Sequence, residues 1–133
     1  MCLYVNHLTP KIADKDIICY KRVRKTKIKG VYKSSIKEFE YVIRQSYTNY
    51  TDIKYTPAII KHIQLANYLF LNYIEGGMFH SYVYYLPTMS VISPNYVALK
   101  CIIPKGAYYF EGHSNIIPCY ASSQIKILEE IKI

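Results

Sequence analysis

The sequence has no tryptophan, and its 133 residues include only 5 glycines, 6 prolines and 9 acidic residues. So little glycine and proline excludes collagen-like and low-complexity chains. The longest apolar stretch, residues 65–74, is shorter than the roughly 20 residues that a membrane-spanning helix needs, so we expect no membrane partner. The first ten residues lack the basic and apolar regions of a secretory signal, which predicts a cytoplasmic protein.

Paired metal-ligand motifs are also missing. The four cysteines (Cys2, Cys19, Cys101 and Cys119) lie far apart, and none forms a C-x-x-C pair. The four histidines show no metal-ligand spacing either, so the sequence predicts neither a metal site nor a cofactor. A cytoplasmic chain keeps such cysteines as reduced thiols, and we expect most of them to be buried.

Hydrophobic residues make up 51% of the chain and charged residues 20%, which is enough apolar surface for a packed core. The length is typical of one domain, here residues 1–133. The net charge of +8 arises in the first half, because residues 1–64 hold 13 basic and 5 acidic residues. The basic residues are densest in 21–29, a run that attracts phosphate-bearing ligands or forms a solvated strand and turn.

Two helices are expected in the N-terminal half. Ser35 and Glu38 have the spacing of a capping box, and the apolar residues that follow recur at helical intervals until about residue 48. Thr56 and Pro57 resemble a helix start, and helical spacing continues from Ile59 to Ala66. From Tyr68 the pattern alternates like a strand, and Gly76–Gly77 predicts the turn of a hairpin that returns over 78–85.

The rest of the chain favours strands. Segments rich in β-branched and aromatic residues predict strands at 16–23, 96–103, 107–111 and 124–128, with turns at Gly30 and at 104–106. His113 is expected in a loop. The predicted fold is therefore α+β: a single compact domain with a mainly antiparallel sheet and one or two helices in its N-terminal half.

Two His-Ser pairs, His80–Ser81 and His113–Ser114, are similar to the paired H-x-[ST] motifs of two-histidine phosphoesterases. In those enzymes one imidazole acts as base and the other as acid. Here the serine follows each histidine directly, so on a strand it points to the opposite face from the imidazole. The motif therefore departs from the enzyme pattern by one residue in both copies.

Three segments resemble small uncharacterised proteins encoded by bacteriophages and mobile elements. These segments are 1–3 with 16–21, 75–82 and 100–109, and together they cover about a third of the chain. The resemblance implies a protein that acts in the cytoplasm of a host cell. It implies no particular chemistry by itself.

The chain also resembles ADP-ribosyltransferases at a greater distance. The first strand of that family carries an aromatic–Arg pair, which falls on Tyr20–Arg22; its second element falls on Phe79–Ser81, and its I-P-x-G strand end on Ile103–Gly106. The catalytic glutamate of the family is missing, because the corresponding late segment reads Ser122-Ser123-Gln124. The resemblance therefore implies a fold that holds a nucleotide without converting it.

These observations predict a non-catalytic protein that binds a nucleotide-like or other phosphorylated ligand. The resemblance to phage proteins implies counter-defence, by sequestering a host signalling nucleotide, as its biological role. Cations would meet phosphate groups, aromatic rings would stack on a base, and His80 and Ser81 would orient the ribose or base edge. The alternatives are a degenerate ADP-ribosyltransferase or nucleotide hydrolase, a protein–protein inhibitor, and a nucleic-acid-binding protein without sequence preference. Self-association is expected from the high apolar fraction. The predicted ligand-binding residues are Tyr20, Lys21, Arg22, Phe79, His80, Ser81, Tyr82 and Lys105.

Overall fold

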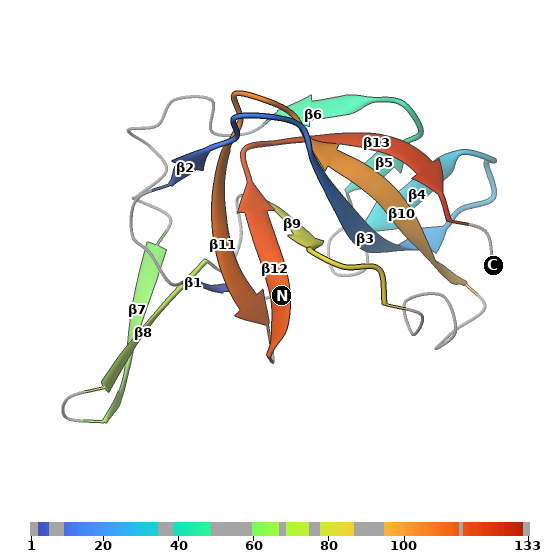
Figure 1. Ribbon diagram of the computed structural model, residues 1–133. Coiled ribbons are helices and arrows are strands. Elements are labelled where there is room, and N and C mark those ends of the chain that lie inside the picture. Colours follow the sequence, from blue (N-terminus) through green and yellow to red (C-terminus); the bar gives the residue numbers. More distant parts are fainter. Residues whose placement is uncertain are drawn as a thin grey trace.

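The structure, a computed structural model, describes residues 3–5, 10–34, 39–48, 60–66, 69–74, 78–86, 95–114 and 116–131. Within these residues every regular secondary-structure element is a β-strand, and the strands pair antiparallel in one sheet (Figure 1). The strands are β1 (Leu3–Val5), β2 (Lys11–Ile12), β3 (Ile17–Lys25), β4 (Val31–Ser34), β5 (Glu40–Val42), β6 (Ser46–Thr48), β7 (Ile60–Ala66), β8 (Leu69–Ile74), β9 (Phe79–Tyr82), β10 (Tyr96–Ile103), β11 (Tyr108–Ser114), β12 (Ile117–Ser122) and β13 (Gln124–Glu130).

The sheet is built around β3. Its main path runs β6-β13-β10-β3-β9-β12-β11-β1-β8-β7. β10 pairs with β3 along its whole length, from Tyr96 to Ile103. The other edge of β3 is shared, because β4 pairs with residues 23–25 and β9 meets it at Tyr20. β5 and β6 end the row β5-β4-β3-β10-β13-β6 yet are close in sequence, so this row curls back on itself (Figure 1).

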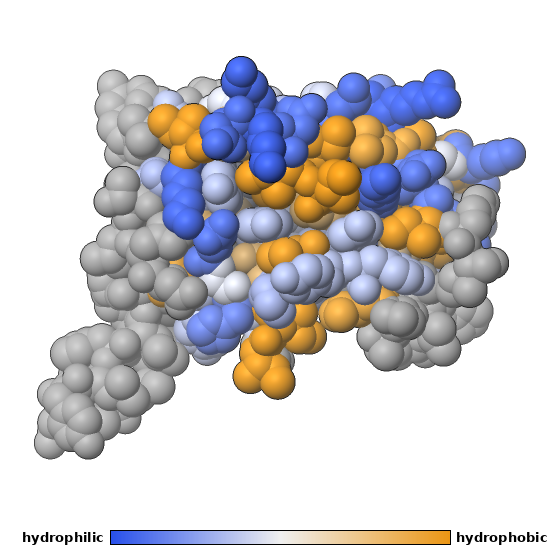
Figure 2. Space-filling model, viewed as in Figure 1, coloured by the Kyte–Doolittle hydropathy of each residue, from blue (hydrophilic) through white to orange (hydrophobic). Residues whose placement is uncertain are grey.

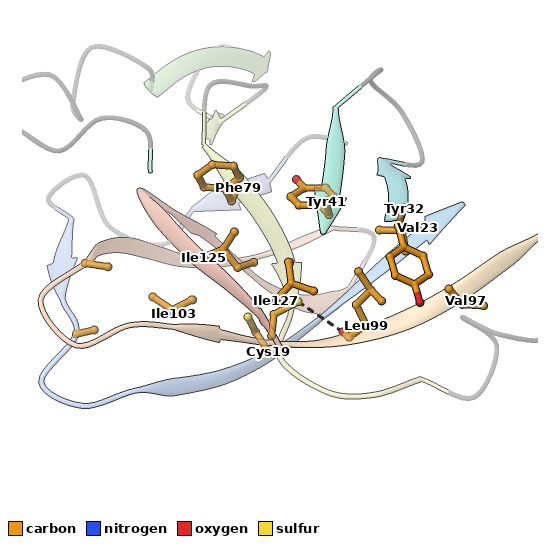
Figure 3. Packing of buried hydrophobic residues seen from close by; sticks show 13 residues of the cluster. Cys19, Val23, Tyr32, Tyr41, Phe79, Val97, Leu99, Ile103, Ile125 and Ile127 are labelled. Carbon is orange, nitrogen blue, oxygen red and sulfur yellow. Dashed lines mark hydrogen bonds between the residues drawn. The ribbon is translucent and has the colours of Figure 1, made fainter. Parts of the chain in front are cut away.

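Two hydrophobic clusters lie on opposite faces of the central strands. The curled row encloses the first core cluster, in which Figure 3 shows the rings of Phe79 and Tyr41 on one side of Ile125 and Ile127 and the Cys19 side chain on the other. The second core cluster lies over β9, β11 and β12. Its buried members are Val5, Met78, Phe110, Cys119 and Ala121.

The expected α+β class is wrong, because the segment predicted as the first helix forms β5 and β6. Tyr41 pairs across strands with Tyr32, and its ring lies 4.9 Å from the ring of Phe39 and 5.4 Å from that of Tyr47. Burial of the Tyr32 and Tyr41 rings between strands outweighs a helical spacing that is only a local preference. A turn with Arg44 at φ 68° separates the two strands. The predicted cap, Ser35 to Glu38, lies outside the described residues.

The second expected helix is also wrong where it is described, since residues 60–66 form strand β7. Its predicted start at Thr56–Pro57 lies outside the described residues. The strand predicted from Tyr68 is present as β8, but the predicted hairpin with the next strand is wrong. β8 pairs with β1 and β7, whereas β9 pairs with β12 and β3. The predicted turn at Gly76–Gly77 itself lies outside the described residues.

The strands predicted at 16–23, 96–103, 107–111 and 124–128 are confirmed as β3, β10, β11 and β13, with shifts of a few residues at their ends. The turns at Gly30 and Gly106 are confirmed by φ angles of 81° and 90°, which favour glycine. The loop expected at His113 is wrong, because β11 continues through Ser114. No helix in the described part of the chain is long and apolar enough to cross a membrane.

Candidate ligand-binding face

The predicted site residues on β3 and β9 lie side by side but alternate between two faces of the sheet. Tyr20 stands opposite Tyr82 in the register, and the ammonium of Lys21 donates a hydrogen bond to the carbonyl oxygen of His80. Successive side chains on a strand point to opposite faces. We call the face toward the first core cluster the inner face and the other the outer face. Lys21, Phe79 and Ser81 belong to the inner face, and Tyr20, Arg22, His80 and Tyr82 to the outer face.

The inner-face residues of the predicted site are buried. Lys21 is 8% exposed, and its ammonium lies 5.1 Å from the centre of the Tyr41 ring, a cation–π contact that partly offsets the loss of hydration. Phe79 packs in the first core cluster, and Ser81 is fully buried. These three side chains therefore contribute to the interior of the protein and are covered from solvent.

The outer face carries an arginine stacked on an aromatic ring. The guanidinium carbon of Arg22 lies 3.9 Å from the centre of the Tyr96 ring. Tyr96 of β10 is paired directly with Arg24, and Arg22 is the neighbouring residue of β3 on the same face, two positions before Arg24. A planar guanidinium stacked in this way keeps its nitrogen donors at the edge of the plane, where they can meet an anion. Both side chains are partly exposed.

Further tyrosines share the outer face with this arginine. The Tyr20 ring lies 6.1 Å from that of Tyr85, tilted by 53°, and Tyr20 stands opposite Tyr82. Burial raises the pKa of Tyr82, Cys119 raises it further, and the positive charge of Arg22 opposes both. Tyr82 therefore remains a neutral phenol at physiological pH. Figure 2 shows a band of pale, moderately hydrophilic side chains over β9 and the segment that follows it, in the view of Figure 1.

Two further cations share the outer face. Arg24 stands between Tyr96 of β10 and Lys33 of β4, and Lys100 of β10 stands opposite Tyr20. Like charges directly opposite each other in a sheet are unfavourable, which applies to Arg24 and Lys33. Each of these cations belongs to a row of residues paired across the strands, and an acidic residue ends each row. Glu40 is opposite Lys33, and Glu129 is opposite Lys100. The middle of the face is therefore basic and aromatic.

Lys105 lies apart from this face. It occupies the turn after β10, at the end of the ladder where Ile103 pairs with Ile17. Its backbone N–H donates a hydrogen bond of 2.9 Å to the Asp16 carboxylate, and its side chain is exposed. The structure therefore joins seven of the eight predicted residues on adjacent strands, and four of those seven share the outer face.

The two His-Ser pairs do not form one site. His80 is opposite Ala121 on the outer face. His113 is opposite Pro118 and packs its ring 5.8 Å from that of Tyr4. Counting alternate residues along β11 and β12 places the two imidazoles on opposite faces of the sheet. They therefore cannot act together as the acid and base of a phosphoesterase. No group of three or more His, Cys, Asp or Glu side chains in the described ranges is placed to hold a metal ion.

Sequence reasoning missed Arg24, Tyr96, Lys100 and Tyr85 on the outer face. The alternation along β3 is a sequence pattern that could have joined Arg24 to Arg22. Tyr96 and Lys100 reach the face only through the register between β3 and β10, which the sequence does not display. Tyr85 follows β9 and is located by its ring contact with Tyr20.

The segment Ser122–Ser123, which the resemblance to ADP-ribosyltransferases aligned with the position of their glutamate, has a structural role. Ser122 and Ser123 are fully buried. The Ser122 hydroxyl donates to the carbonyl oxygen of Phe79 at 3.5 Å, and the Ser123 hydroxyl accepts from the backbone N–H of Tyr108 at 3.0 Å. Comparison of the whole chain with protein-family models, curated proteins and solved structures gave no match. Both family resemblances therefore remain predictions.

Proposed function

We propose that the chain is a binding protein for a nucleotide-like ligand, and that the outer face of β3, β9 and β10 holds the ligand. In this proposal Arg22 meets the phosphate, with Arg24 and Lys100 adding positive charge. Tyr20 and Tyr85 stack against the base. The buried residues Lys21, Phe79 and Ser81 hold β3 and β9 in position and do not touch the ligand.

The observation that carries the proposal is the stacking of Arg22 on Tyr96 at 3.9 Å. Nε of Arg22 is buried and has no hydrogen-bond partner among the described residues, so an anion would meet the two terminal nitrogens. Hydrogen bonds from guanidinium to phosphate oxygens are charge-assisted and are about twice as strong as neutral ones. The stacked ring restricts the guanidinium before binding, which lowers the entropic cost of ordering it.

The tyrosines support a ligand with an aromatic base. Stacking of a base on an aromatic side chain contributes about 1–3 kcal/mol and tolerates any base. Tyr20 is partly exposed and has Tyr85 beside it and Lys100 opposite it, so a ring stacked there lies next to a cation. A phosphate group joined to a planar base fits this arrangement better than phosphate alone. Sequestration of a host signalling nucleotide is the biological role that the phage resemblance adds.

Binding without turnover is favoured because the face offers cations and phenols in its middle, while its carboxylates stand at the ends of the rows. The resemblance to ADP-ribosyltransferases points the same way, since the glutamate position holds Ser122-Ser123-Gln124. Ser122 and Ser123 are both buried in structural hydrogen bonds.

The test is a thermal-shift screen with mononucleotides, cyclic nucleotides, nicotinamide adenine dinucleotide, inorganic phosphate and a short single-stranded DNA. A ligand at a hundred times its dissociation constant stabilises the fold by about 2.7 kcal/mol. Arg22→Met is expected to abolish the shift, and Arg22→Lys to reduce it, because lysine cannot donate two parallel bonds. Lys105→Met is the matched control, since it removes one positive charge from an exposed turn away from the face.

Three results would overturn the proposal. They are the absence of a shift with every nucleotide, an equal shift in wild type and Arg22→Met, and a shift with DNA alone, which would indicate a non-specific nucleic-acid-binding protein. Products formed from nicotinamide adenine dinucleotide or a cyclic nucleotide would replace binding with catalysis. Melting of each variant without ligand separates loss of binding from loss of folding.

A further inference from the structure

Two cysteines far apart in sequence face each other on the inner side of β3 and β10. Cys19 pairs directly with Cys101 in a ladder whose register is regular from Ile17 to Arg24. Directly opposite residues of antiparallel strands have Cα atoms about 4.5–5.5 Å apart. Disulfides span Cα separations of roughly 4.4–6.8 Å, so the backbone of the sheet already has the spacing that a disulfide needs.

The two thiols contact each other in the buried core. Both cysteines are fully buried, and each is a free thiol. Their side chains lie together on the inner face, and each thiol shifts the pKa of the other. The S–H of Cys101 lies 3.7 Å from the carbonyl oxygen of Leu99 (Figure 3). No side chain therefore has to cross the core before the two sulfurs can bond.

The two sulfurs differ in their electrostatic surroundings. The neighbouring Cys101 side chain lowers the pKa of Cys19, burial opposes this, and the Ser81 hydroxyl and the buried ammonium of Lys21 lower it further. The neighbouring Cys19 side chain, together with burial, raises the pKa of Cys101. A thiolate is the nucleophile in thiol oxidation, so Cys19 is the sulfur prepared to react first.

We propose that Cys19 and Cys101 are a modification site, at which a peroxide forms a reversible disulfide between β3 and β10. The Cys19 thiolate attacks one oxygen of hydrogen peroxide, which gives a sulfenic acid and releases hydroxide. The Cys101 sulfur then attacks the Cys19 sulfur and displaces its hydroxyl group. The Cys101 proton and the proton first lost by Cys19 convert the two hydroxides to water. The cysteines lose two electrons and one peroxide is reduced to two waters.

Cys119 provides a matched comparison within the same chain. It is also a free thiol with no exposed surface, but the residues opposite it are Gly112 and Tyr82. Its S–H donates to the carbonyl oxygen of Ile117 at 3.3 Å, and burial raises its pKa to about 11. Cys119 therefore shares the burial of the proposed pair but lacks both the facing thiol and the lowered pKa.

The test treats the full chain with hydrogen peroxide, denatures it, alkylates the remaining thiols and maps the peptides by mass spectrometry. We expect a cross-linked peptide joining Cys19 to Cys101, a mass loss of two hydrogen atoms, and full reversal by dithiothreitol. Cys119→Ser should behave as wild type, whereas Cys19→Ser and Cys101→Ser should give no such peptide. The oxidised wild type should also melt at a higher temperature than the reduced protein.

The proposal fails if Cys19 and Cys101 are still alkylated after an exposure that fully oxidises Cys2. It also fails if Cys119 oxidises as readily as the pair, or if cross-links to Cys2 predominate. The wild-type peptide map decides each of these outcomes, so the result does not depend on whether the serine variants fold. Nucleotide binding plays no part in the assay, and the pair can be tested whatever the outer face binds.

Discussion

Gly112 should be the least replaceable glycine that the structure describes. It lies on β11 opposite Val5 of β1, and a Cβ added to it would be 1.9 Å from the carbonyl oxygen of Tyr4. The next atoms are also backbone, the Tyr4 carbonyl carbon at 2.8 Å and the Val5 Cα at 3.2 Å. Backbone atoms cannot turn aside as a flexible side chain can. Gly112→Ala must therefore push β1 away from β11.

The cost of this change is limited by the cost of releasing β1. Val5 is 8% exposed, and returning a buried valine to water costs about 1.5–3 kcal/mol. Each lost backbone hydrogen bond adds about 0.5–1.5 kcal/mol. We therefore expect Gly112→Ala to lower the free energy of unfolding by about 2–4 kcal/mol.

Chemical denaturation measures this loss, and hydrogen exchange locates it. Exchange at the amides of Tyr4 and Val5 should accelerate in Gly112→Ala while exchange on β3 and β10 changes little. Gly106→Ala is the control, because it has open space and only the strain of a positive φ, about 1–2 kcal/mol, and should leave β1 protected. A Gly112→Ala protein within about 0.5 kcal/mol of wild type, with β1 still protected, would refute the packing of β1 on β11.

Three further predictions concern charge and association. Burial and a 2.8 Å hydrogen bond to Glu130 raise the pKa of Tyr32 to about 12, so its protonated form stabilises the fold below pH 10. That stabilisation should be lost as the pH rises from about 10 to 12, by roughly 2–3 kcal/mol in wild type relative to Tyr32→Phe in alkaline denaturation. A double-mutant cycle of Arg22→Met and Tyr96→Leu should give a coupling energy of about 0.5–1 kcal/mol, and a value of zero would contradict their stacking. Self-association stays a prediction: Ile116 is 93% exposed, and sedimentation of wild type against Ile116→Ser should show a weaker oligomer in the variant.

The residues of the proposed binding face were predicted from sequence only in part. The basic run and the segment at Phe79 pointed to β3 and β9, and the structure makes these strands neighbours. The alternation that sends Lys21 inward and Arg22 outward is a property of any strand. Which of the two faces packs against the first core cluster depends on β4, β5 and β13, and β13 lies about a hundred residues further along the chain. Tyr96 and Lys100 join the face only through cross-strand register.

The sequence alone determined where several strands and turns lie, because β-branched and aromatic runs favour extended backbone, and glycines accept the positive φ of the turns at Gly30 and Gly106. It did not determine the secondary structure of residues 39–48 or 60–66, where the spacing of apolar residues suits a helix as well as a strand. Strand pairing decided those segments, since Tyr41 is buried opposite Tyr32 of β4, and residues 60–66 pair with β8. It also decided that β9 joins β3 and β12, and that Cys19 meets Cys101. Such contacts join residues distant in sequence, and local preferences carry no information about them.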